Sequence, residues 1–231
     1  VVQFLRSDYR RSPVVRLRAP CHPWWTEACG YAAGGRSVAG ILVGRRLVLI
    51  IACLAAGALL LRLDGITQQS LSARELHNAL LARRYYLGAG AGLPLWKQRV
   101  LEELRQTVQP IEPPVLDHVA AWSYRLTGGE RIWIPRTLSA LLWVLGGVFL
   151  YRIGVRVTTG AGALVALALY LFWPYGVVMS RTYMPDPMMV ALLLGGALAV
   201  IRYWERPSRE RFASAAGVAA LATAAKPGVA L

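Results

Sequence analysis

The chain has 231 residues, of which 56% are apolar and 16% charged, and its mean hydropathy is +0.43. Soluble globular domains carry about 25% charged residues, so this composition favours a membrane protein. The formal charge of +14 comes from 26 Lys and Arg against 12 Asp and Glu, but the cations lie mostly at the ends of apolar runs and in the N-terminal segment. Few aromatic residues are interleaved with them, which argues against nucleic-acid binding.

Residues 1–46 are basic and irregular, with eight arginines against Asp8 and Glu27. We predict a basic, poorly ordered cytoplasmic tail here, followed by a transmembrane domain over residues 47–231. Because the chain begins with Val and ends within an apolar run, we interpret it as the N-terminal part of a longer protein. The three cysteines form no CxxC pair, so neither a disulfide framework nor a zinc site is expected.

Five apolar runs follow the tail, and together they predict a multi-spanning, all-α transmembrane bundle. The first is only 15 residues long, but the arginines at its ends, including Arg62, can reach the membrane surface along their aliphatic stems. A buried core helix would explain this run alone, but not its repetition downstream. The predicted spans are Leu47–Leu61, Ile134–Gly154, Ala161–Val178, Met188–Ile201 and a last one from about Ala213 onward.

Arginines are concentrated in the N-terminal tail and in the short connections after the second and fourth spans. All three segments lie on one side if the spans alternate, and the positive-inside tendency makes that side cytoplasmic. The stretch SRTYMPDPMMV, residues 180–190, and a long segment over about residues 64–132 are then extracytoplasmic. We therefore expect a multi-pass cell-membrane protein with its active site on the outer face.

Two amphipathic helices are predicted within this outer segment. Leu76, Leu80 and Leu87 recur near one helical face, and Leu101, Leu104 and Val108 recur on another. Amphipathic helices beside a membrane tend to lie in the interface, so we expect both helices there.

The outer side also collects ionisable residues between long apolar runs, where they are costly unless water or a polar cavity receives them. Each has an ordinary explanation: Glu75 as a solvated helix charge, Arg136 as an interfacial anchor, and Asp186 as a helix cap. A metal site built from Glu112, Asp117 and His118 lacks HxH or HExxH spacing, so no metal ligand is predicted. The full set is Glu75, His77, Glu112, Asp117, His118, Arg136, Arg181 and Asp186.

Four short motifs resemble membrane glycosyltransferases of the GT-C fold, in particular glycosyltransferase family 39, the protein mannosyltransferase and aminoarabinose transferase group. Glu112, Pro113 and Pro114 are similar to the group's His-Pro-Pro-like turn, and RTLSAL from Arg136 to Leu141 resembles its span opener. SRTYMPDPMMVALLL resembles the group's Ser-Arg…Asp stretch, and Lys226 with Pro227 its Lys-Pro element. The resemblance covers roughly residues 45–231.

This resemblance implies a transferase that moves a sugar from a polyprenyl-phosphate donor to an acceptor of unknown type at the outer membrane face. Arg and Lys would bind the lipid phosphate through charge-assisted hydrogen bonds, and a carboxylate would take the acceptor's proton. The resemblance names no certain cofactor and leaves a divalent metal requirement open.

One motif departs from the family's pattern. The group usually carries an Asp-Glu pair in the first outer loop, with the Asp assigned as the base, whereas this sequence has Arg74 and Glu75. Either the base has moved, with Glu75, Asp64, Glu112 and Asp117 as candidates, or the acceptor differs, or transfer activity is lost.

We accordingly predict Asp186 as the active-site carboxylate and Glu75 as the candidate replacement base. Arg136 and Arg181 would hold loop geometry or bind phosphate, and the predicted substrate-binding set also includes Glu112, Asp117, His118 and Lys226. Two alternatives stay open: a catalytically degenerate GT-C-like scaffold that binds lipid-linked sugars, and a transporter. The transporter is disfavoured because the ionisable residues concentrate at span ends rather than within spans.

Overall fold

The computed structural model describes residues 38–68, 72–88 and 92–225, with side chains from residue 46 onward. All regular structure in these ranges is helical, which confirms the predicted all-α class. Residues 48–231 form one compact unit, separate from residues 1–47, so the predicted tail lies outside the described residues except where the first helix begins. The helices are α2 Val38–Leu63, α3 Ala73–Gly88, α4 Leu95–Thr107, α5 Val115–Thr127, α6 Trp133–Val157, α7 Gly160–Phe172, α8 Pro174–Arg181, α9 Asp186–Glu205 and α10 Arg209–Ala225.

Within the described residues, three helices are long and apolar enough to cross a membrane: α2, α6 and α9. The bent pair α7 and α8 makes a fourth if it is counted as one span. Only 11% of the apolar stretch of α2 and 28% of that of α6 is buried, so most of their apolar surface faces outward, as lipid contact requires. The fifth predicted span, from about Ala213 onward, falls on α10, whose 17 described residues are not among these candidates. The residues after Ala225 lie outside the described part of the chain, so this span stays a prediction.

The third predicted span, Ala161–Val178, falls on the bent pair α7 and α8 and is not a single straight helix. The helix breaks between Phe172 and Pro174, and the axes of α7 and α8 differ by 53°. Proline lacks the N–H of a helical residue, and its ring clashes with the carbonyl four residues earlier. It also disfavours the helical conformation at the preceding residue, and Trp173 accordingly adopts φ −58° and ψ 124°.

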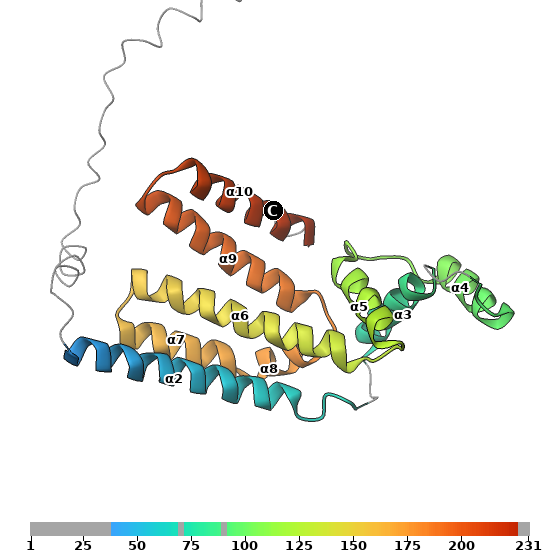
Figure 1. Cartoon of the computed structure of the whole chain (residues 1–231), viewed down its shortest axis with the longest axis horizontal. Coiled ribbons are helices and arrows are strands. Elements are labelled where there is room, and N and C mark those ends of the chain that lie inside the picture. Colours follow the sequence, from blue (N-terminus) through green and yellow to red (C-terminus); the bar gives the residue numbers. More distant parts are fainter. Residues whose placement is uncertain (1–37, 69–71, 89–91, 226–231) are drawn as a thin grey trace, which may run out of the picture. The chain divides into compact units, whose positions relative to one another are not determined.

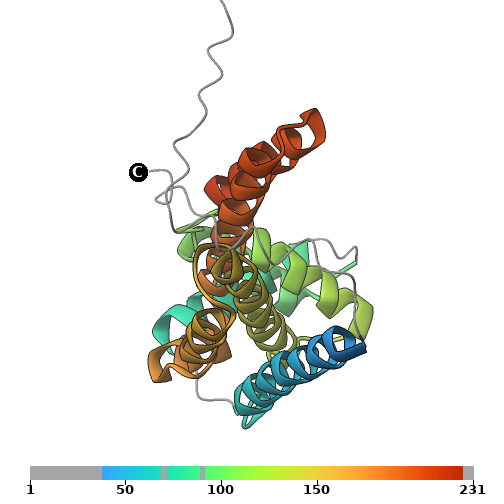
Figure 2. The same cartoon turned by 90° about the vertical axis from the view of Figure 1, so that its left-hand side faces the viewer.

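The long helices pack in the order α7, α6, α9, α10, with α6 between α7 and α9 (Figures 1 and 2). Small residues allow the closest approach: a Cβ added to Gly154 of α6 would lie 2.9 Å from the Cβ of Ala163 in α7. Close packing at small residues is how helices associate where water supplies no hydrophobic driving force. The aromatic rings of Trp143 and Tyr170 stack across the same interface at 4.7 Å between centroids.

Arg62 lies in the last turn of α2. Its side chain was expected to reach the membrane surface, but it is fully buried in the protein. Its guanidinium donates hydrogen bonds to Ser180 Oγ at 2.6 Å, to the Ala58 carbonyl at 2.8 Å and to the Leu171 carbonyl at 2.9 Å. Leu171 O lies in the last turn of α7, where the proline break removes ordinary helical partners. Arg62 therefore joins the end of α2 to the break between α7 and α8.

The helices α3, α4 and α5 lie beyond the ends of the long helices, on the side where α6 and α9 begin (Figure 1). Leu81, Leu104 and Val108 form a common buried cluster, which confirms the apolar face predicted for α4. In α3 the buried face is centred on Leu81 and Ala82, whereas Leu76 is 45% exposed, so the predicted face was partly wrong. The packing partners explain this difference: Leu81 packs with Leu104 and Val108, and Ala82 packs with Leu116 and Tyr124 of α5.

Candidate active site

A buried ion pair lies where α3, α6 and the turn after α2 meet. Arg136 Nε lies 2.7 Å from Glu75 Oε1, and Arg136 Nη2 lies 3.0 Å from Glu75 Oε2. The same guanidinium donates through Nη1 to the carbonyls of Ile66, at 2.8 Å, and Gln68, at 2.6 Å. The side chains of Glu75 and Arg136 are only 1% and 6% exposed, so the pair is shielded from water. A planar guanidinium suits this two-point contact with a carboxylate, which fixes the relative orientation of α3 and α6.

The loop between α8 and α9 is attached to the outer helices through Tyr183, which is fully buried. Its backbone N–H donates to Glu75 Oε1 at 2.9 Å, and its carbonyl accepts from Asn78 Nδ2 at 3.1 Å. Its hydroxyl donates to Asp117 Oδ1 of α5 at 2.5 Å. Three polar groups of one residue thus bind α3 and α5, so the loop that precedes Asp186 has a defined position.

Asp117 is only 8% exposed, and this burial has the largest effect on the pKa of its carboxyl group. Loss of hydration raises the pKa of its carboxyl group, and the hydrogen bond from Tyr183 and the nearby His118 and His77 oppose this effect only in part. Burial and the neighbouring carboxylate also raise the pKa of the Tyr183 hydroxyl. Tyr183 therefore stays a hydrogen-bond donor at neutral pH, and Asp117 binds a proton more readily than a solvated aspartate.

A small polar cavity of about 20 Å³ adjoins this pair. Arg74, Glu112 and Asp117 line it together with Pro185, the residue before α9. Arg74 Nη2 and Glu112 Oε1 form an ion pair of 2.6 Å at the same place. The volume is sufficient for a water molecule with several polar partners. The structure therefore brings the predicted residues Glu112 and Asp117 together at one cavity beside the start of α9.

Arg181 and Asp186 lie on either side of the Tyr183 loop. Arg181 Nη2 donates to the carbonyl of Asp64, in the same 64–68 turn that Arg136 holds. Asp186 is the first residue of α9, and Pro185 rather than Asp186 occupies the N-cap position. A carboxylate in the first turn is still favoured by the helix dipole.

The remaining predicted residues fall elsewhere. His118 is exposed, and its ring lies 4.0 Å from that of Tyr85 between centroids. His77 Nε2 lies 3.1 Å from the Gln109 carbonyl oxygen, and Lys226 lies outside the described residues. Among the residues that the structure describes, no group of three or more His, Cys, Asp or Glu side chains is placed to hold a metal ion.

Tyr183, Asn78 and Ser139 were not predicted from the sequence. Ser139, which lies in α6 within the Arg136 to Leu141 motif, donates to the Met184 carbonyl at 3.5 Å. Tyr183 lies within the stretch SRTYMPDPMMV, residues 180–190. Its neighbours in the sequence do not distinguish a buried tyrosine that holds the structure together from one at the membrane interface. Its role depends on α3 and α5, which are far away in sequence.

The family model for dolichyl-phosphate-mannose-protein mannosyltransferases matches residues 111–231 of this chain. The chain belongs to this family. It is accordingly a membrane glycosyltransferase of the mannosyltransferase type. Searches of curated proteins and of solved structures find no match.

The mannosyltransferase match covers α5 to α10 and so includes Glu112, Asp117, Arg136, Arg181 and Asp186, whereas Glu75 and α2 to α4 precede it. The family-matched part and the segment before it are joined by the Glu75–Arg136 ion pair and by Tyr183. Within the described residues of the mannosyltransferase, this end of the long helices thus brings together buried polar side chains from distant segments.

Proposed function

We propose that the protein transfers a sugar from a polyprenyl-phosphate donor to an acceptor at the extracytoplasmic membrane face. The family match supports the transferase class and a lipid-linked donor. The observation that carries the location is the polar assembly at one end of the long helices, where α3, α6 and the α8–α9 loop are held together by Glu75, Arg136 and Tyr183.

Asp186 is the proposed active-site carboxylate. In the transfer step, the acceptor's nucleophilic atom forms a bond to the anomeric carbon, the bond from that carbon to the phosphate oxygen breaks, and polyprenyl phosphate leaves with the electron pair. The acceptor's proton passes to a carboxylate, which is general-base catalysis. Asp186 suits this role because it begins α9 directly after a loop fixed by Tyr183, and a fixed loop keeps a reacting group in position.

Arg136, Arg181 and Glu75 are proposed to organise this site. The guanidinium of Arg136 is occupied by Glu75 and two backbone carbonyls, and Arg181 donates to Asp64. These contacts favour the loop-holding role over phosphate binding for both arginines. They also favour a positioning role for Glu75, whose two carboxylate oxygens both accept hydrogen bonds. Lys226 stays the proposed phosphate ligand.

The distribution of arginines supports the proposed location of the polar assembly on the outer side of the membrane. Arg152 and Arg156 in the C-terminal part of α6, and Arg202 and Arg206 at the end of α9, lie at the end opposite the polar assembly, where Arg156 Nε pairs with Glu205 Oε1 at 2.8 Å. Short loops rich in arginine tend to stay in the cytoplasm, so the assembly is proposed to face outward.

Turnover by the full-length protein with a panel of polyprenyl-phosphate sugars tests the activity. Asp186→Asn should abolish transfer while the protein still inserts into the membrane. The matched control is Glu102→Gln, which removes one carboxylate from the exposed surface of α4 and should transfer at the wild-type rate. Wild-type turnover by purified Asp186→Asn protein would remove Asp186 from the mechanism.

Cysteine labelling tests the orientation. In a background without Cys21, Cys29 and Cys53, a cysteine at the exposed Glu102 position should react with an impermeant reagent added outside the cell. A cysteine at the exposed Ser208 position, between α9 and α10, should react only after the membrane is opened. The reverse pattern would refute the proposed topology.

A catalytically degenerate scaffold is the second proposal, and Arg74 is the observation that favours it. Where the resemblance implies an aspartate, this chain has an arginine that is paired with Glu112. A protein of this kind would bind a polyprenyl-phosphate sugar without turnover, and its binding would not change in Asp186→Asn. A donor-binding measurement beside the turnover assay therefore separates the two proposals.

A further inference from the structure

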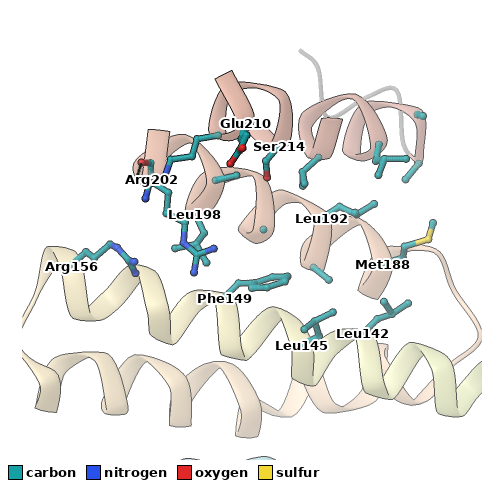
Figure 3. A pocket seen from close by; sticks show the side chains of 18 of the residues that line it. Leu142, Leu145, Phe149, Arg156, Met188, Leu192, Leu198, Arg202, Glu210 and Ser214 are labelled. Atoms are coloured by element: carbon teal, nitrogen blue, oxygen red, sulfur yellow. Dashed lines mark hydrogen bonds between the residues drawn. The ribbon is translucent and has the colours of Figure 1, made fainter. Parts of the chain in front are cut away.

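A long groove runs between α6, α9 and α10, with a volume of about 1010 Å³ (Figure 3). Each helix contributes residues from one face: Leu142, Leu145 and Phe149 from α6, with Leu192 from α9 and Val218 from α10 among the others. Gly195 of α9 keeps the groove open beside Phe149, since a Cβ at this position would lie 3.1 Å from the ring. Most of the groove's length is therefore apolar.

One end of the groove is charged. Figure 3 shows Arg156, Arg202 and Glu210 at this end, whereas Leu142 and Met188 lie at the other. Four arginines face two glutamates, which leaves an excess of positive charge. The charged lining residues are Arg156, Arg202, Glu205, Arg206, Glu210 and Arg211.

The arginines differ in how they are engaged. Arg156 pairs with Glu205, and Arg211 donates to the backbone carbonyls of Arg202 and Arg206. The side chains of Arg202 and Arg206 form no hydrogen bond or ion pair with any residue that the structure describes, and both are exposed. Two guanidinium groups at the mouth of an apolar groove are thus available to an anion.

We propose that this groove binds an anionic phospholipid, with its phosphate between Arg202 and Arg206 and an acyl chain along α6. From Leu142 to Arg156 the groove follows 14 residues of helix, which is about 21 Å at 1.5 Å per residue. One leaflet of hydrocarbon is about 15 Å deep, so an acyl chain fits within this length. Basic pockets between membrane helices on the cytoplasmic side are suited to anionic headgroups, and this end is cytoplasmic in the topology proposed above.

A lipid explains the groove better than a second copy of the chain does. Two copies in one membrane share an orientation, so the arginine-rich end of one would face the arginine-rich end of the other. A zwitterionic lipid would leave the positive excess uncompensated. The proposed lipid binding does not depend on transferase activity, so a negative result for one proposal leaves the other unaffected.

Native mass spectrometry of the full-length protein from nanodiscs with equal phosphatidylglycerol and phosphatidylcholine tests the proposal. The wild-type protein should retain phosphatidylglycerol in preference to phosphatidylcholine. Arg202→Gln/Arg206→Gln should lower phosphatidylglycerol retention about tenfold or more. The matched control is Arg152→Gln/Arg209→Gln, which removes the same charge at the same end from exposed side chains that do not line the groove. It should retain phosphatidylglycerol as the wild type does.

A second variant tests the apolar part. Val218→Trp leaves all arginines in place but fills the groove, so retention should fall without a change of charge. Equal retention of both lipids by the wild type, or equal loss in the two double variants, would overturn the proposal. Efficient disulfide cross-linking of two copies through Ser214→Cys would also overturn it, because a second copy would then fill the groove.

Discussion

The buried pair between Glu75 and Arg136 allows the sharpest test of how the outer segment is attached to the long helices. Glu75→Gln removes the negative charge but keeps the size of the side chain. The guanidinium of Arg136 would then remain buried, at 6% exposure, without its carboxylate. Breaking such a pair from one side costs about 3–5 kcal/mol, because the remaining charge stays desolvated. We expect the free energy of unfolding to fall by this amount.

Unfolding of the full-length protein in detergent micelles, followed by circular dichroism, measures this change. A double-mutant cycle with Glu75→Gln, Arg136→Gln and both together isolates the interaction between the two side chains. We expect a coupling energy of about 2 kcal/mol or more. Glu102→Gln is the control, since its pair with Arg105 is exposed and 3.8 Å long, and it should change stability by less than about 0.5 kcal/mol.

Two results of the double-mutant cycle and its control would refute this reasoning. If the two single effects add, with a coupling below about 0.5 kcal/mol, the pair does not hold α3 against α6. A loss of the same size in Glu102→Gln would show that the assay reports general charge effects rather than burial.

Two further predictions concern Asp117 and the helix interfaces. Because burial raises the pKa of Asp117 above its ordinary value of 3.8, its contribution to stability is fully present below about pH 3.8 and is lost as pH rises through the folded-state pKa. Asp117→Asn keeps an acceptor for Tyr183 and should weaken the decline of melting temperature between pH 4 and pH 8; parallel curves for the two proteins would contradict this. Gly154→Ala should lower stability by about 1–3 kcal/mol, since its Cβ would overlap Ala163, whereas Gly217→Ala, with no atom within 4 Å of the added Cβ, should raise it by up to about 1 kcal/mol. Shifts in the same direction would contradict this packing argument.

The sequence predicted the helical class and the first, second and fourth spans from continuous apolar runs, and the apolar face of α4 from hydrophobic periodicity, because both signals are local. It also carried the family resemblance, which the match over residues 111–231 confirmed. The break at Pro174 was predictable in principle from one residue, but an apolar run on both sides concealed it. In α3 the apolar pattern alone indicated Leu76, whereas the structure buries Leu81 against α4 and Ala82 against α5.

The burial and the partners of charged residues at helix ends could not be predicted from the sequence. Arg62 and Arg136 both stand at the edge of an apolar run, and a linear pattern assigns both to the membrane surface. Hydropathy and charge along the chain determined that this is a membrane protein and where its spans lie, because those properties are local. Only the tertiary structure decided that these two arginines are buried and which oxygens they bind, because their partners come from segments up to 118 residues away.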